Sequence, residues 1–302
     1  MSRISCTFMS AALRRPINLT VIVPTDKCCA YHLYIPEHKP MKTLYLLEGM
    51  LSNETGFASY TRIQPIAEDN NLYVVIIGGE NMHYADSDVT LNYYDKMVSN
   101  DVLKYTRATF NLSDKREDTF IGGFSMGGFG CVNVGLRHPD IYSRIVAMSP
   151  GMVKPWMMEL IGKPAGTLSA QGFTEENYKA MYGIPNVAAF VNSKDDSDYL
   201  AEKVKKETPE LMPKIFVAAS ADEDLCEPCI KPWKNNMVDL GYDLTYYELK
   251  GLGHSWPVAE YSLIEAMKWL PIDTFQGNFL QYTDDANLGN DLLAHFAVYY
   301  NL

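Results

Sequence analysis

Short apolar runs alternate along the chain with segments whose apolar residues recur at helical spacing. A run that is apolar at nearly every position, such as 43–47 or 72–77, is typical of a strand buried on both faces of a mostly parallel sheet. Residues 17–23 instead alternate apolar with polar side chains, which is typical of an edge strand. The pattern predicts strands at 17–23, 31–36, 43–47, 72–77, 119–121, 142–148, 214–219 and 243–249, and helices at 58–71, 93–110, 126–138, 229–240 and 256–270.

This alternation of strands and helices predicts an α/β fold with a doubly wound, mostly parallel sheet and helices on both faces. A length of 302 residues suits one large domain, 1–302. Residues 151–209 break the rhythm with several glycines and prolines, so we interpret them as a small insertion over the sheet and the active site. Residues 272–302 form a C-terminal extension that is too rich in aromatic residues for a disordered tail, and we expect it to pack on the body or on a neighbouring subunit.

In such sheets, ligands bind beyond the carboxyl ends of the strands. The loops that follow residues 47, 121, 219 and 249 should therefore share one rim of the sheet. One of these loops contains a G-x-S-x-G pattern, from Gly123 through Ser125 to Gly127, between a predicted strand and a predicted helix. A sharp strand-to-helix turn exposes a serine hydroxyl, and the helix directs its positive end toward the place where an oxyanion would form. This context favours Ser125 as a nucleophile.

A nucleophilic serine needs a base and a carboxylate that orients the base. His254 stands between glycine and serine directly after the last predicted strand, and it is better placed than the other five histidines; His83 could reach the rim but precedes the serine. The loop after residue 219 offers three carboxylates. All three lie between serine and histidine in the chain, as the orienting group does in α/β-hydrolases. We select Asp224 as the orienting group, ahead of Asp222 and then Glu223.

Two backbone N–H groups should hold the oxyanion. One is expected from Met126, the residue after the nucleophile, and the second from Met50, with Leu51 as its neighbour, in the loop after residues 43–47. Large side chains on or near the rim, Trp156 and Trp256 together with the two methionines, are candidate walls of a small acyl pocket.

Composition limits the classes of molecule that the protein is expected to bind. With 37 acidic and 26 basic residues, the formal net charge is −11, and no Lys/Arg cluster offers a nucleic-acid surface. No apolar run is long enough to span a membrane, and the first ten residues lack a secretory pattern, so we expect a cytoplasmic protein with no membrane partner. We predict neither a cofactor nor a metal site. The pair Cys226 and Cys229 forms a C-x-x-C that lacks a second ligand pair, and we interpret both as inert thiols.

Several segments together resemble the esterase D group of α/β-hydrolases, which includes tributyrin-type esterases and S-formylglutathione hydrolases. The matching segments occur in order and span residues 12–270; they are 44–50, 124–130, 137–140, 223–225 and 253–256. The resemblance implies the α/β-hydrolase fold, a triad of Ser125, Asp224 and His254, a small-molecule acyl ester as substrate, and a homo-oligomer. Where the group usually has His-Gly, this chain has Glu48-Gly49, so we add Glu48 and Leu51 to the residues expected at the substrate pocket.

The predicted function is that of a serine carboxylesterase acting on short-chain acyl esters through an acyl-enzyme. Two alternatives share this chemistry: a thioesterase of the S-formylglutathione hydrolase type, and an esterase that removes acetyl or feruloyl groups from plant polysaccharides. Two others do not hydrolyse esters, namely an acyltransferase and a catalytically inactive binding module. The sequence leaves the choice of substrate open.

Overall fold

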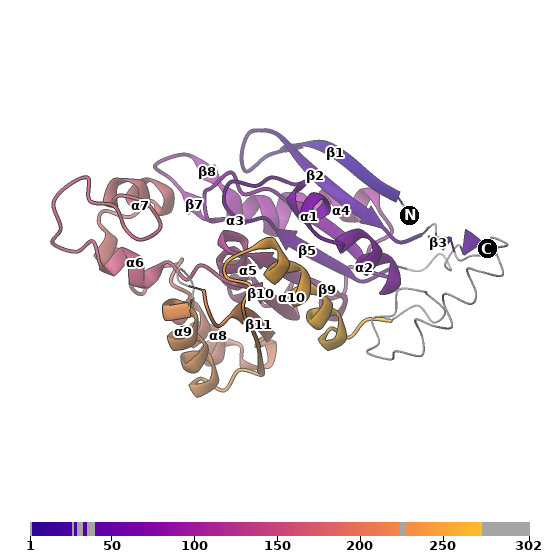
Figure 1. Cartoon of the computed structure of the whole chain (residues 1–302). Helices are drawn as coiled ribbons and strands as arrows, with labels where there is room; N and C mark the ends of the chain where they lie inside the picture. The colour runs from indigo at the N-terminus through magenta and orange to yellow at the C-terminus, as the bar shows by residue number, and fades with distance from the viewer. Residues whose placement is uncertain (1, 26, 29–32, 35–39, 224–226, 274–302) are drawn as a thin grey trace.

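Eight strands form the main sheet of the computed structural model, which describes residues 2–25, 27–28, 33–34, 40–223 and 227–273. The strand order is β1-β2-β6-β5-β9-β10-β11-β12, and every pair from β6 to β12 is parallel. The doubly wound, mostly parallel sheet that the sequence predicts is therefore confirmed (Figure 1). The eight strands are β1 (Ser2–Ser10), β2 (Arg15–Val23), β5 (Thr43–Leu47), β6 (Tyr73–Ile77), β9 (Thr119–Phe124), β10 (Arg144–Met148), β11 (Lys214–Ser220) and β12 (Leu244–Leu249).

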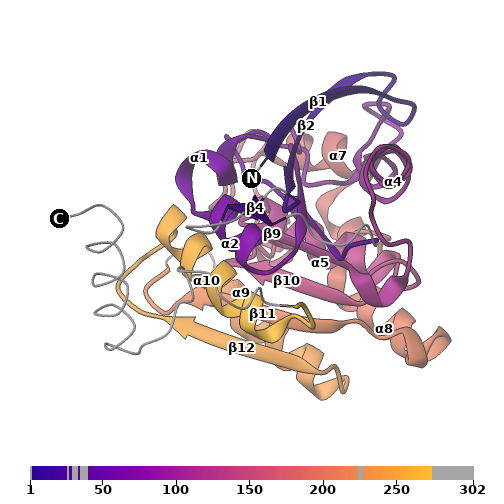
Figure 2. The ribbon, with the colours of Figure 1, turned by 90° about the vertical axis from the view of Figure 1, so that its right-hand side faces the viewer.

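Helices cover both faces of this sheet. Their bounds are α1 (Gly56–Tyr60), α2 (Ile63–Asp69), α3 (Tyr94–Lys96), a π-helix (Met97–Val102), α4 (Leu103–Thr109), α5 (Met126–Arg137), α6 (Lys154–Met158), α7 (Glu175–Tyr182), α8 (Ser197–Glu207), α9 (Glu227–Asp239) and α10 (Trp256–Trp269). Helices α2 and α10 lie on one side of the strands and α4, α5 and α8 on the other (Figure 2). Two short hairpins, β3 (Lys27–Cys28) with β4 (Leu33–Tyr34) and β7 (Asp86–Ser87) with β8 (Asn92–Tyr93), complete the strands.

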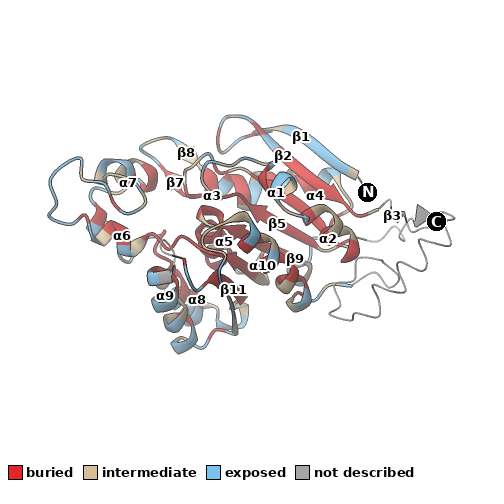
Figure 3. Ribbon diagram, viewed as in Figure 1, coloured by how far each residue is buried: buried red, intermediate tan, exposed pale blue. Residues whose placement is uncertain are grey.

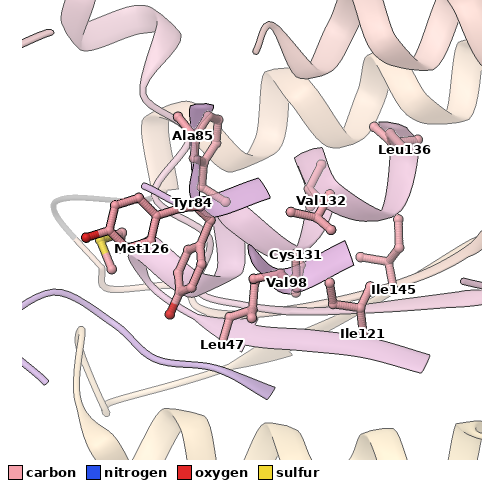
Figure 4. Packing of buried hydrophobic residues seen from close by; sticks show 14 of the residues in the cluster. Leu47, Tyr84, Ala85, Val98, Ile121, Met126, Cys131, Val132, Leu136 and Ile145 are labelled. Atoms are coloured by element: carbon pink, nitrogen blue, oxygen red, sulfur yellow. The ribbon is translucent and has the colours of Figure 1, made fainter. Parts of the chain in front are cut away.

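The central strands are buried on both faces because each lies between two layers of helices. In β5, for example, Leu44 and Leu46 belong to the core beneath α2 and α10, whereas Tyr45 and Leu47 belong to the core around α5. Figure 3 shows the resulting buried centre, and Figure 4 shows part of the α5-side core. This two-sided burial is the reason that these strands are recognisable as short apolar runs.

The edge of the sheet differs from the prediction. Residues 15–23 do form a strand, but β1 pairs with it along its full length and itself occupies the edge. β1 is mostly exposed, and its sequence, SRISCTFMS, has too little apolar character to stand out as a strand. Of the predicted strand 31–36, only β4 falls within the described residues, and the extension beyond residue 273 lies outside them. No helix in the described part of the chain has the length and apolar character needed to cross a membrane.

Candidate active site

Ser125 lies at the sharp turn between β9 and α5, in the middle of the sheet. Its backbone has φ 58° and ψ −116°, a left-handed region that a residue with a side chain rarely adopts. Hydrogen bonds hold this strained turn: the Ser125 N–H donates to Met148 O at 3.0 Å, and the Gly151 N–H donates to Ser125 O at 3.0 Å. The strand-to-helix context predicted for the G-x-S-x-G pattern is thus present.

The two glycines of the pattern are required by close backbone approach. A Cβ atom on Gly123 would lie 2.1 Å from the carbonyl oxygen of Gly127. A Cβ on Gly127 would lie 2.1 Å from Leu47 O, because the first turn of α5 passes directly over the end of β5. These contacts bring the serine turn against the loop that follows β5, where the second oxyanion donor is expected.

Ser125, His254 and Glu223 meet at the carboxyl ends of β9, β12 and β11. Ser125 Oγ is 2.8 Å from His254 Nε2, and the Glu223 carboxylate is hydrogen-bonded to His254 Nδ1. The other Glu223 oxygen accepts from Ser149 Oγ at 2.9 Å and from the Ser220 N–H at 3.1 Å. Because Glu223 is only 2% exposed, its donors hold the carboxylate in one orientation toward the imidazole.

The carboxylate at the histidine is therefore Glu223, which the sequence analysis placed last of three. The preferred residue, Asp224, lies outside the described residues. Asp222 points elsewhere: its carboxylate accepts from the Gly251 N–H at 2.9 Å and the Gly253 N–H at 3.2 Å, and it also bonds the Ser220 hydroxyl. Asp222 thus joins the β11 loop to the loop that carries His254.

A series of aromatic rings supports the histidine. Phe124 stacks on the His254 imidazole with ring centres 4.9 Å apart and planes at 20°. Trp256 packs against Phe124 at 5.5 Å and stacks on Tyr60 at 5.1 Å. Trp256 is thus close to the reacting groups, one ring removed from His254. Sequence reasoning did not assign a role to Phe124 or Ser149, although Phe124 ends β9 and Ser149 directly follows β10.

The two residues expected to supply oxyanion donors are Met126, which directly follows Ser125, and Met50, in the loop after β5. Met126 is the first residue of α5, so its N–H has no acceptor in a preceding helical turn. In the loop after β5, the Leu51 N–H donates to Asn81 Oδ1 at 2.8 Å, whereas the Met50 N–H bonds no other group in the described part of the chain. Gly49 lies beside the serine, since a Cβ there would be 3.4 Å from Ser125 Cβ.

The other residues expected at the pocket are not brought together. Leu51 is 90% exposed and points into solvent. Trp156, on α6, is buried in the α5-side core. Glu48 is fully buried, with its carboxylate bonded to the Phe57 N–H and the Ser52 hydroxyl rather than facing the serine. Burial raises the pKa of Glu48 to about 7, although these hydrogen bonds oppose the shift.

His83 and Cys229, whose roles the sequence left open, are both buried in the structure. Buried His83 is hydrogen-bonded through Nδ1 to the Tyr182 hydroxyl at 2.6 Å, and burial lowers its pKa to about 3, so it is neutral and joins α7 to the body. Cys229 is buried, which raises the pKa of its thiol to about 11. A thiol of this kind is protonated at neutral pH and unreactive. Its partner in the C-x-x-C pattern, Cys226, lies outside the described residues.

Known proteins that are similar to this chain include esterases. A family model with the description "Putative esterase" matches residues 10–232. An acetyl esterase of Caldicellulosiruptor saccharolyticus is 29% identical over 270 residues, which cover 89% of this chain and 98% of that protein.

Two solved structures from Staphylococcus aureus have the same fold. An S-formylglutathione hydrolase is 25% identical with a TM-score of 0.70, and a fluorophosphonate-binding serine hydrolase is 24% identical with a TM-score of 0.70. Each similarity covers 89% of this chain and 98% of the other.

Proposed function

The chain belongs to the Esterase family and is a hydrolase of the α/β-hydrolase fold, and from this premise we propose that it is a serine carboxylesterase for short-chain acyl esters. The observation that carries the proposal is the 2.8 Å contact between Ser125 Oγ and His254 Nε2, with Glu223 at the other ring nitrogen. In this arrangement Ser125 is the nucleophile, His254 the base and Glu223 the group that orients the base.

The reaction has two halves. In the first, Ser125 Oγ attacks the ester carbonyl carbon while His254 Nε2 takes the hydroxyl proton, and Glu223 stabilises the imidazolium. The negative oxygen accepts hydrogen bonds from the N–H groups of Met126 and Met50. His254 then gives the proton to the departing alcohol, which leaves an acyl group on Ser125. In the second half, water takes the place of the alcohol and releases the acid.

Contacts near the serine support a role for the segment 151–209 in shaping the substrate site. It begins at Gly151, whose N–H bonds the serine carbonyl, and the Gln171 side-chain nitrogen lies within 3.5 Å of the position that a Gly151 Cβ would occupy. Tyr178 on α7 donates to Gln171 Oε1 at 3.1 Å and fixes this side chain. We infer that the segment forms an insertion over the active site and limits the acyl group that fits.

Acetyl esters are the first substrates to test, because the curated relative is an acetyl esterase. Purified wild type should hydrolyse p-nitrophenyl acetate and should react with a fluorophosphonate probe, and the Ser125→Ala variant should do neither. Wild-type protein that fails at both would contradict the proposal. A probe-labelled protein that turns over esters only when an acceptor alcohol is present would instead be an acyltransferase.

A thioesterase is the second candidate, supported by the similarity to an S-formylglutathione hydrolase. Wild-type kcat/KM for S-formylglutathione, p-nitrophenyl acetate and a feruloyl ester would rank the candidates directly. A strong preference for the thioester would replace the oxygen-ester assignment, and a preference for the feruloyl ester would favour the polysaccharide side-group alternative.

A further inference from the structure

Glu48 is bonded to both ends of the loop that carries Met50. At the start of the loop, the Glu48 N–H donates to Ile77 O at 3.1 Å, and its carbonyl oxygen accepts from the Tyr84 hydroxyl at 3.0 Å. Figure 4 shows the Tyr84 ring beside Leu47 in the core beneath the loop. At the far end, where α1 begins, Glu48 Oε1 accepts from the Phe57 N–H at 2.8 Å. The side chain therefore closes residues 48–57 into a ring.

Two further contacts tighten this ring. Glu48 Oε2 accepts from Ser52 Oγ at 2.9 Å, in the middle of the loop. Gly56 packs directly on both groups, since a Cβ there would lie 2.0 Å from Ser52 Oγ and 2.7 Å from Glu48 Oε2. The loop is thus folded around the carboxylate with no room for another side chain.

Burial of the Glu48 carboxylate in this loop is unfavourable in free energy. The carboxylate is fully buried, and no lysine, arginine or histidine in the described part of the chain forms an ion pair with it. Burial raises the pKa of this carboxyl and the charge of Glu54 adds to the shift, so both favour the protonated form. Burying such a group costs free energy. Its retention is better explained by the geometry that it imposes than by stability.

The contacts of Glu48 restrict the backbone on the N-terminal side of Met50. The loop backbone is fixed before Met50 by Glu48 and after it by the bond from the Leu51 N–H to Asn81. Leu51 has φ 61°, so the backbone changes direction just beyond Met50 at a conformation that needs outside support. Both sides of Met50 are thus held, and its own N–H bonds no other group in the described part of the chain. Gly49, the residue before it, packs beside Ser125.

We propose that Glu48 is a positioning residue for the oxyanion site: its carboxylate closes the loop and so holds the Met50 N–H where the carbonyl oxygen becomes negative. This inference rests on the proposed esterase function. It assigns Glu48 a part in the reaction without contact to the substrate. Hydrogen bonds to an oxyanion strengthen in the transition state, so a loosened donor should lower kcat more than it alters KM.

The test compares three variants on p-nitrophenyl acetate. Glu48→Ala removes both side-chain bonds, and we expect kcat to fall by about 10²-fold, the loss typical of a misplaced catalytic group, with KM changed by less than about threefold. Glu48→Gln retains an acceptor for the Phe57 N–H and a partner for Ser52, and it should keep kcat within about threefold of wild type. Glu54→Gln removes an acid from the same loop without breaking these bonds and is the matched control.

The inference is overturned if Glu48→Ala keeps the wild-type kcat or changes only KM. It is also overturned if Glu48→Gln and Glu48→Ala lose the same activity. If Glu48→Ala does not fold, Ser52→Ala removes a single bond, and its kcat should fall by about threefold to tenfold; an unchanged kcat would then overturn it. Failure of the esterase proposal is distinguishable, since wild type itself would then neither hydrolyse the ester nor react with a fluorophosphonate.

Discussion

Two neighbouring acidic residues on the β11 loop, Asp222 and Glu223, direct their side chains to different partners. Glu223 points inward to His254, and Asp222 points along the rim to the N–H groups of Gly251 and Gly253. Asp222 holds the histidine loop through its backbone, whereas Glu223 acts on the imidazole itself. In the proposed mechanism, only the contact of Glu223 with the imidazole fixes the tautomer and stabilises the imidazolium.

We therefore expect Glu223→Gln to lower kcat by about 10⁴-fold, because the amide no longer stabilises the protonated histidine. Asp222→Asn should cost less than about tenfold, since an amide oxygen can still accept from the glycine N–H groups. Steady-state rates on p-nitrophenyl acetate, with Asp224→Asn measured alongside, decide the assignment. If Asp224→Asn alone is crippled, Glu223 is not the orienting group.

Glu48 gives a second prediction, for stability against pH. Its pKa is raised from 4.5 to about 7, so the folded chain binds more protons than the unfolded chain between these pH values. The free energy of unfolding must then fall as pH rises through this window, by about 3 kcal/mol for this group. Glu48→Gln cannot titrate, so its stability relative to wild type should increase from pH 4.5 to pH 8.

Urea unfolding of wild type and Glu48→Gln at several pH values measures this difference. A difference between wild type and Glu48→Gln that is independent of pH would mean that Glu48 titrates normally.

At the scale of elements, the turn from β9 to α5 combines a strained backbone with close packing against a neighbouring strand. Its strained serine is held by neighbouring backbone, and α5 can approach β5 only because Gly127 has no side chain. The same packing that permits the turn also sets the distance between the serine and the loop of Met50. Stability and reactivity therefore depend on the same contact.

Gly127→Ala should be strongly destabilising, by about 3 kcal/mol or more, because the added methyl group meets the fixed backbone of Leu47 rather than a mobile side chain. Gly151→Ala is the matched control, since its Cβ would have no neighbour closer than 3.5 Å. Thermal unfolding of both variants compares them, and similar melting temperatures would show that α5 can shift away from β5.

At the scale of the whole molecule, one buried ion-pair network joins three separate parts of the chain. Arg137 at the end of α5 bonds Asp95 in α3 and, at 2.8 Å, Asp195 just before α8; His138 adds a 2.8 Å contact to Asp95. Burial acts to raise the pKa of Asp95, but the bond from His138 and the charge of Arg137 outweigh it, so the pKa is lowered. Asp95 therefore stabilises the fold only while its carboxylate is charged. For Asp195 burial outweighs the charge of Arg137 and raises the pKa to about 6.

Replacing Arg137 by Met leaves Asp95 and Asp195 buried without their cation, and we expect a loss of about 3–5 kcal/mol in the free energy of unfolding. Lys203→Met removes one member of an exposed pair, 4.0 Å from Glu207, and should change stability by less than about 0.5 kcal/mol. Denaturant unfolding tests both. Equal effects of the two variants would show that the buried network adds nothing beyond a surface pair.

The sequence by itself predicted the inner strands of the sheet, helices α5, α9 and α10, the serine turn and the histidine candidate, but it predicted one helix at 58–71 where the structure has α1 and α2. The inner strands and the turn are encoded locally, because two-sided burial leaves a continuous apolar run and a tight turn leaves its glycines. It missed β1, whose exposed edge carries no such pattern.

Only the tertiary structure showed that Glu223 faces His254 and which groups Glu48 contacts. Neighbouring acids on one loop differ only in the direction that the folded backbone gives each side chain, and no local pattern records this direction. Likewise, Glu48 lies two residues before Met50, and the sequence therefore suggested a pocket residue. In the folded chain its carboxylate instead accepts from the N–H of Phe57, nine positions further along. Such roles depend on contacts between segments distant in sequence, which exist only once the sheet and its loops are assembled.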